Sequence, residues 1–217
     1  MAISRTDAIK TGVRLEMVTV AWMLVEAVVA LGAGVLARSV LLTAFGVDSA
    51  IELASGIVLY RRLSAESAGL PTDEVDWLES RTGRISAILL VLLCAYVVLS
   101  SAAGLVLRVI PYPSFAGLAV SAAAIVAMPL LARAKQGVNR VLDSSSLRAD
   151  IAETVSCAYL AAVTLAGLGV SALTGWWWVQ YVAALGLLLW LVPEAREALE
   201  ERTHNGHDQG GQGESDE

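Results

Sequence analysis

One apolar stretch decides the fold of this chain: residues Ser39 to Tyr60, which read SVLLTAFGVDSAIELASGIVLY. The stretch is long enough to cross a bilayer as a helix, which takes about 20 residues. Two acids interrupt it, Asp48 and Glu52, whose spacing of four places them on one helix face. A charged side chain at the bilayer centre costs roughly 2.5–3.5 kcal/mol on insertion scales, so acids at this depth need a reason. We therefore expect a transmembrane helix with an acidic functional site.

A second apolar stretch, Leu147 to Leu168, repeats this spacing with Glu153 and Cys157. Placing the two stretches over one another aligns Asp48 with Glu153 and Glu52 with Cys157. The same alignment pairs two further positions, Ser39 with Ser144 and Leu42 with Leu147. Antiparallel repeats that meet at a central site are common in transporters. We expect the two helices to run in opposite directions and to bring all four side chains near the membrane midplane.

The composition places the whole chain in the membrane. Of its 217 residues 56% are hydrophobic, the mean hydropathy is +0.65, and charge is confined to short segments and the two ends. Leu, Ala, Val and Gly dominate without the two-residue alternation of a membrane barrel, so the expected fold is all-α. No basic patch with interleaved aromatic residues points to nucleic acid. Six apolar runs predict six transmembrane helices in a polytopic membrane protein: Met17–Ala37, Val40–Tyr60, Ile85–Val109, Ser114–Ala132, Ser146–Leu173 and Trp176–Val192.

Basic residues predict the orientation. They concentrate before the first run, between the second and third, between the fourth and fifth, and after the sixth. The positive-inside rule then puts both termini in the cytoplasm and the protein in the cytoplasmic membrane of the cell. We expect residues 1–16 to form a cytoplasmic segment, residues 17–194 the six-helix transmembrane domain, and residues 195–217 a short cytoplasmic tail that is largely disordered. The connection from Leu63 to Gly83 reads as a polar, acidic loop.

Three carboxylates and a thiol predict a metal site formed by Asp48, Glu52, Glu153 and Cys157. Four such ligands suit a tetrahedral ion, and the thiolate favours Zn²⁺ or Cd²⁺ over Mg²⁺ or Ca²⁺. Coordination by carboxylates alone would also admit Mn²⁺, Co²⁺ or Fe²⁺. Protons would exchange with the metal at the same groups. The metal is cargo, and no cofactor is expected.

Two further acids belong to this hypothesis. Glu26 lies midway along the first apolar run, where it could support a ligand or pass protons. Asp150 lies one turn before Glu153 and could line the path of the ion or carry a charge at the start of the helix.

These residues resemble the cation diffusion facilitator (cation efflux) family of six-helix divalent-metal transporters. The resemblance rests on Glu26–Gly34, Ser39–Glu52 and Leu147–Cys157, and on the turn Gly175–Trp178. It implies Zn²⁺ efflux by proton antiport, with the metal held by paired ligands on the second and fifth helices. The family pattern has Asp where Glu52 and Cys157 stand, and often His at the position of Glu153. Members usually carry a cytoplasmic dimerisation domain, whereas only 23 residues follow Glu194 here, so we expect any homodimer to form through the membrane helices.

Two other functions use the same acids differently. A proton- or cation-conducting, channel-like protein would use them as a relay without tight metal binding. A membrane scaffold with a decayed metal site would keep them without transport. An enzyme is not expected, because the sequence has no nucleophile–base set, phosphate loop or cofactor motif.

Overall fold

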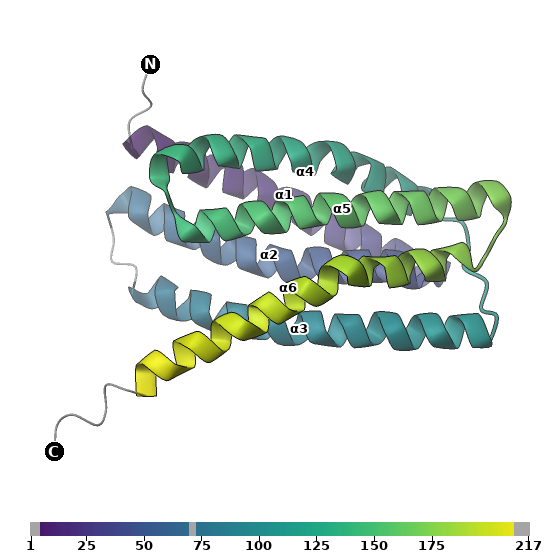
Figure 1. The fold of residues 1–217 in the computed structure, drawn as a ribbon. Coiled ribbons are helices and arrows are strands. Elements are labelled where there is room, and N and C mark those ends of the chain that lie inside the picture. The colour runs from purple at the N-terminus through teal and green to yellow at the C-terminus, as the bar shows by residue number, and fades with distance from the viewer. Residues whose placement is uncertain (1–4, 70–72, 211–217) are drawn as a thin grey trace.

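The computed structural model describes residues 5–69 and 73–210, which form six helices and no strand. Each of the six predicted apolar runs lies wholly or mostly in one helix, and an all-α fold is confirmed. The helices are α1 (Arg5–Ala37), α2 (Val40–Ala68), α3 (Asp73–Val106), α4 (Phe115–Leu142), α5 (Ser145–Thr174) and α6 (Val179–Gly210). They run side by side as one elongated bundle, with successive helices in opposite directions (Figure 1).

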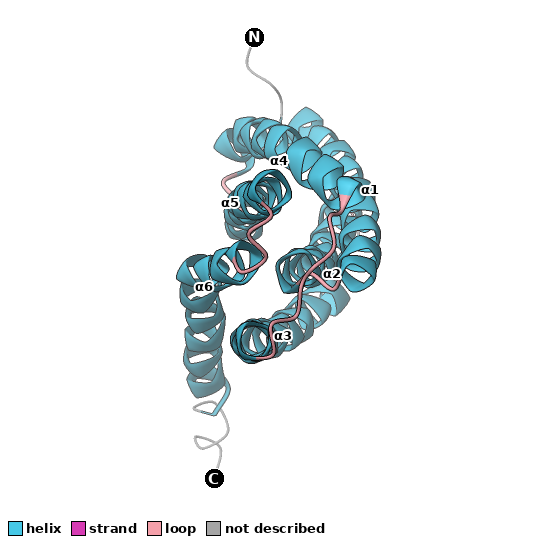
Figure 2. Cartoon of the chain, turned by 90° about the vertical axis from the view of Figure 1, so that its right-hand side faces the viewer, coloured by secondary structure: helices cyan, strands magenta, loops and turns pink. Residues whose placement is uncertain are grey.

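Five helical segments are long and apolar enough to span a membrane: Arg5–Ala37, Val40–Ala68, Ala87–Val106, Phe115–Leu142 and Ser146–Thr174. The sixth predicted span, in α6, is not among them. Its apolar run is short because Pro193, Glu194 and Arg196 follow directly. Pro193 lies inside α6, where a proline removes a backbone hydrogen bond and kinks the helix. The part of α6 near its C-terminal end turns away from the bundle (Figure 2).

Two serines start the repeated helices in the same way. Ser39 and Ser144 both have extended backbone angles, and their hydroxyl oxygens accept hydrogen bonds from the backbone N–H groups of Leu42 and Leu147. Each is therefore an N-cap that satisfies a donor left free in the first helical turn. The aligned positions of the two stretches have the same local structure.

Several helices continue beyond the predicted apolar runs. Helix α1 begins at Arg5, so most of the segment expected outside the membrane domain is helical. Helix α2 continues to Ala68 and ends on Gly69, whose φ of 67° is left-handed. Because α3 begins at Asp73, most of the connection expected as a loop from Leu63 to Gly83 is helical as well.

The C-terminal tail also differs from its prediction. Helix α6 continues to Gly210, so residues 195–210 are helical where disorder was expected. The sequence EAREALEER from Glu194 to Arg202 consists of good helix formers, which explains the continuation. Residues 211–217 of the predicted tail lie outside the described residues.

We call the two ends of the bundle the basic end and the Trp end. At the basic end α2 and α4 finish and α5 begins, with Arg61, Arg62, Arg140 and Arg148 nearby. At the Trp end α5 finishes, and Trp176, Trp177 and Trp178 precede α6.

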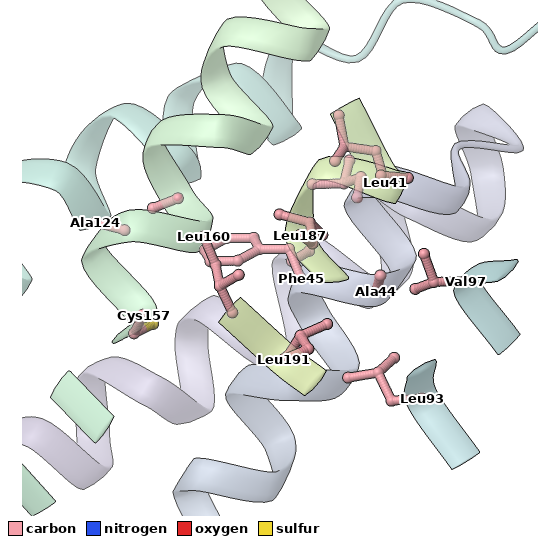
Figure 3. Close-up of a cluster of buried hydrophobic side chains, with 14 of the residues drawn as sticks. Leu41, Ala44, Phe45, Leu93, Val97, Ala124, Cys157, Leu160, Leu187 and Leu191 are labelled. Atoms are coloured by element: carbon pink, nitrogen blue, oxygen red, sulfur yellow. The ribbon is translucent and has the colours of Figure 1, made fainter. Parts of the chain in front are cut away.

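Helix α2 occupies the interior of the bundle, where it contacts α1, α3, α5 and α6 (Figure 2). A large apolar cluster surrounds it toward the Trp end. Phe45 of α2 lies against Leu160 of α5 and Leu187 of α6, with Cys157 at the edge of the group (Figure 3). A smaller cluster at the basic end contains Ala8, Leu59, Leu63, Val138, Leu147 and Ile151. The polar side chains described next lie beside the large cluster, which includes Cys157, and extend toward the smaller one.

A line of buried acids as the candidate cation site

Asp48 and Glu52 are buried inside the bundle, with 1% and 4% of their surface exposed. Oδ2 of Asp48 and both side-chain oxygens of Glu52 accept no hydrogen bond from a protein donor, and the two carboxyl groups lie close enough to share a proton. A buried polar atom without a partner costs about 1–3 kcal/mol, and more when it is charged. The negative charges of Glu153, Glu194 and Glu26 act on both residues and add repulsion. These carboxylates therefore need protons or a cation to be stable together.

Both carboxylate oxygens of Glu26 have hydrogen-bond partners in the protein. Its Oε2 accepts from Trp22 Nε1 at 2.7 Å, and its Oε1 accepts from Ser49 Oγ at 2.7 Å and from Cys157 Sγ at 3.1 Å. The residue is fully buried. These bonds join α1, α2 and α5 at one point, so the Cys157 thiol is held by Glu26.

The register of α2 against α5 is defined near both ends of the bundle. Toward the Trp end, a Cβ on Gly167 would lie 2.5 Å from Leu41 Cδ2, so these two residues are neighbours. Toward the basic end, Leu63 and Leu147 belong to the same apolar cluster. The two contacts agree on one antiparallel register.

This register staggers the predicted ligands. Counting along α2 and α5 from these two contacts, at 1.5 Å per residue, puts Glu52 level with Cys157. The same count puts Gly56 level with Glu153. By this count Asp48 and Glu153 are staggered by about 12 Å along the bundle axis, and their binding of one common ion stays a prediction. The reason for the stagger is helix length: α2 has 29 residues and α5 has 30, so positions nine residues inside opposite ends do not meet.

The acids therefore form a line along the bundle and no compact tetrahedron. Within the part of the chain whose side chains are described, no group of three or more His, Cys, Asp or Glu side chains is arranged to hold a metal ion. Glu153 is half-buried and interacts electrostatically with Asp150 and Glu194, and also with Lys135 and Glu16. It connects the Asp48–Glu52 pair to a second polar group nearer the basic end.

That second group is a buried ion triad. Lys135 Nζ on α4 lies 2.5 Å from Asp150 Oδ2 on α5 and 3.0 Å from Glu16 Oε2 on α1. The Lys135 and Glu16 side chains are each 1% exposed, and the Asp150 side chain is 8% exposed. Asp150 thus pairs with a lysine and does not join Asp48 and Glu52.

Sequence reasoning missed three of these residues. Glu16 and Glu194 stand at the ends of apolar runs and read as interfacial, and Lys135 reads as one of several basic residues after the fourth run. One signal could have pointed to Lys135: the chain has only two lysines among 15 basic residues, and this one follows an apolar run directly.

Apolar side chains flank the polar region. The apolar cluster around Leu63 and Leu147 lies toward the basic end, and the larger cluster includes Phe45 and Leu160 toward the Trp end. At the Trp end lies a cavity of about 220 Å³, lined in part by Ser114, Ser171, Trp177 and Gln180.

Fold and composition together define an all-α polytopic membrane protein, and its interior holds a line of acids. Comparison with models of known protein families finds no match, and comparison with curated protein sequences finds none either. The cation efflux resemblance therefore stays a prediction from the residues quoted for it.

Proposed function

We propose that the protein carries a divalent cation, with Zn²⁺ the best fit, across the membrane. One observation carries the proposal: Asp48 and Glu52 are buried in a membrane-spanning helix with three carboxylate oxygens that accept no hydrogen bond from a protein donor. Such a pair is costly unless something positive binds it. The pair lies beside a thiol and three further acids, which supports a cation over a proton alone.

The chemistry of these groups favours Zn²⁺ or Cd²⁺, with Mn²⁺, Co²⁺ and Fe²⁺ as further cargo. Glu52 and Cys157 lie at one depth, and Cys157 offers the soft sulfur that these two ions prefer. Because carboxylate and thiolate ligands must lose their protons to bind metal, metal affinity should fall as the pH falls. Exchange of metal for protons would thus couple cation export to proton entry.

Transport would require the two apolar clusters to open in turn. Opening the cluster near Leu63 would expose the acids to the basic end, which we take as cytoplasmic. Opening the cluster near Phe45 would expose them to the cavity at the Trp end. This is alternating access around a fixed polar line.

Zn²⁺ flux in proteoliposomes with an imposed pH gradient tests the proposal. We expect Asp48→Asn with Glu52→Gln to abolish flux, because neutral amides remove the negative charge and keep the shape. Glu66→Gln is the matched control, since Glu66 lies on the same helix outside the acid line and pairs with Arg5. Flux that survives the double substitution contradicts the proposal.

A second function, proton conduction, has support of its own. Glu26 forms a continuous set of hydrogen bonds with Trp22, Ser49 and Cys157, and the described side chains contain no ready metal group. A relay would carry protons in vesicles free of divalent metal, and Glu26→Gln would stop it. Metal-free proton flux with no Zn²⁺ flux would favour this function over the first.

A further inference from the structure

The ion triad sets two carboxyl groups against one lysine. Glu16 and Asp150 share one ammonium, and the carboxyl group of Glu153 lies nearby. Oε1 of Glu16 has no hydrogen-bond partner although the residue is fully buried. The Glu16 carboxyl group therefore has one buried oxygen that can bind a further cation.

The unpartnered oxygen points along the line of acids. A Cβ added to Gly56 would lie 3.2 Å from Glu16 Oε1, so this oxygen lies against α2. Gly56 is one helical turn from Glu52, and Asp150 is one turn from Glu153. The triad is thus the next polar step from the central acids toward the basic end.

The Lys135 ammonium occupies the position that a cation would take on a path from the basic end to Asp48 and Glu52. Its ammonium contacts α1 and α5 from α4, and the small apolar cluster lies between it and the basic end. An ion arriving from that end meets the triad before it meets Glu52. Oxygen pairs from two carboxylates are suitable ligands for a divalent cation.

We propose that Glu16 and Asp150 form an inner divalent-cation site that the Lys135 ammonium fills in the absence of metal, and that an arriving cation displaces this ammonium. The proposal rests on the proposed function for the identity of the ion. A divalent cation balances both carboxyl groups in the ionised form that binds metal, whereas the single ammonium balances one. The displaced lysine side chain swings on its flexible stem toward the basic end, which α4 reaches at Leu142.

The two lysines of the chain supply a reporter of metal binding at the triad and its control. Lys10 and Lys135 are the only lysines in the sequence, and Lys10 is exposed whereas Lys135 is 1% exposed. Purified protein without substitutions is treated with an amine-acylating reagent, with and without Zn²⁺, and modification of each lysine is measured by peptide mass spectrometry. Without metal we expect Lys135 to react at least roughly tenfold more slowly than Lys10. Zn²⁺ should raise the rate at Lys135 several-fold and leave Lys10 unchanged.

Two variants separate this site from the central one. With Asp48→Asn and Glu52→Gln, Zn²⁺ should still accelerate acylation of Lys135, because the inner site keeps its own ligands. With Glu16→Gln, Lys135 should lose its dependence on Zn²⁺. A Lys135 rate that Zn²⁺ does not change in the parent protein overturns the inference, as does a rate equal to that of Lys10 without metal.

The failures of the two proposals are distinguishable. If the Zn²⁺ effect on Lys135 disappears in the Asp48→Asn, Glu52→Gln protein, the inner site is refuted and transport through the central acids stands. If Zn²⁺ accelerates acylation of Lys135 in the parent protein but the parent protein carries no Zn²⁺ flux, the inner site stands and the transport proposal falls.

Discussion

At the scale of single residues, Cys157 has two roles that can be separated. Its thiol donates to Glu26 Oε1, and counting residues along the two helices puts it level with Glu52. The first role needs only a donor, which a hydroxyl also provides. The second needs the soft sulfur atom.

Cys157→Ser is therefore an informative change. Serine keeps the hydrogen bond to Glu26 and removes the sulfur, so we expect Cd²⁺ affinity to fall by roughly tenfold or more while Mn²⁺ affinity changes little. Equilibrium dialysis of the two ions measures this selectivity. Cys94→Ser is the comparison variant, because Cys94 is half-buried on α3 and lies close enough to Asp48 and Glu194 to feel their charge, so the two variants show which thiol binds Cd²⁺. An equal loss for both ions would show that Cys157 does not bind the metal.

At this scale the sequence predicted the acids and not their partners. The spacing of Asp48 and Glu52 inside an apolar run predicts a shared face, and both side chains are indeed buried. The bond between Cys157 and Glu26 joins residues 131 positions apart. No local pattern encodes such a contact, because it depends on how α1 and α5 pack.

At the scale of helices, α1 and α2 pack closely through small residues. A Cβ on Gly34 would lie 2.7 Å from the backbone N of Thr43, and one on Gly46 would lie 2.6 Å from the backbone N of Leu31. Such glycines let membrane helices approach backbone to backbone. This contact places Glu26 of α1 against Ser49 of α2.

Gly34→Ala should separate these helices. We expect a loss of about 1–3 kcal/mol of stability, because the new methyl group meets backbone that cannot move away alone. Thermal unfolding in detergent measures the loss. Gly32→Ala two residues away is the matched control, since its Cβ meets nothing within 4 Å and alanine favours the helix by about 1 kcal/mol. Equal melting temperatures for the two variants would contradict the close packing.

Hydropathy predicted where each helix is apolar and did not predict where it ends. The run from Val40 stops being apolar at Tyr60, whereas α2 continues to Ala68, because polar residues such as Arg61 and Glu66 continue a helix readily. The extra turns explain why Asp48 and Glu153 are staggered. The register of α2 against α5 therefore depends on polar residues near the end of α2, which the apolar pattern does not include.

At the scale of the whole molecule, the topology depends on α6. Five helices are apolar enough to span the membrane, and α6 would be the sixth. In the bundle, α1 begins and α6 ends at the same end (Figure 1). If α6 crosses the membrane, the positive-inside rule predicts that both chain ends face the cytoplasm.

Reporter fusions test this topology. A reporter active only in the cytoplasm should be active at both the N-terminus and the C-terminus. Activity at the N-terminus alone would mean that α6 does not cross.

A homodimer that forms through the membrane helices also remains a prediction about the whole molecule. Crosslinking in native membranes measures it.

The central claim is that the partnerless oxygens of Asp48 and Glu52 bind a divalent cation. Anomalous scattering at the zinc edge, from crystals soaked in Zn²⁺, tests it most directly. We predict a peak about 2.0–2.2 Å from a carboxylate oxygen of Glu52 or Asp48, as for zinc bound by carboxylates elsewhere. Peaks confined to exposed acids at the surface, with none between the two apolar clusters, would contradict the account.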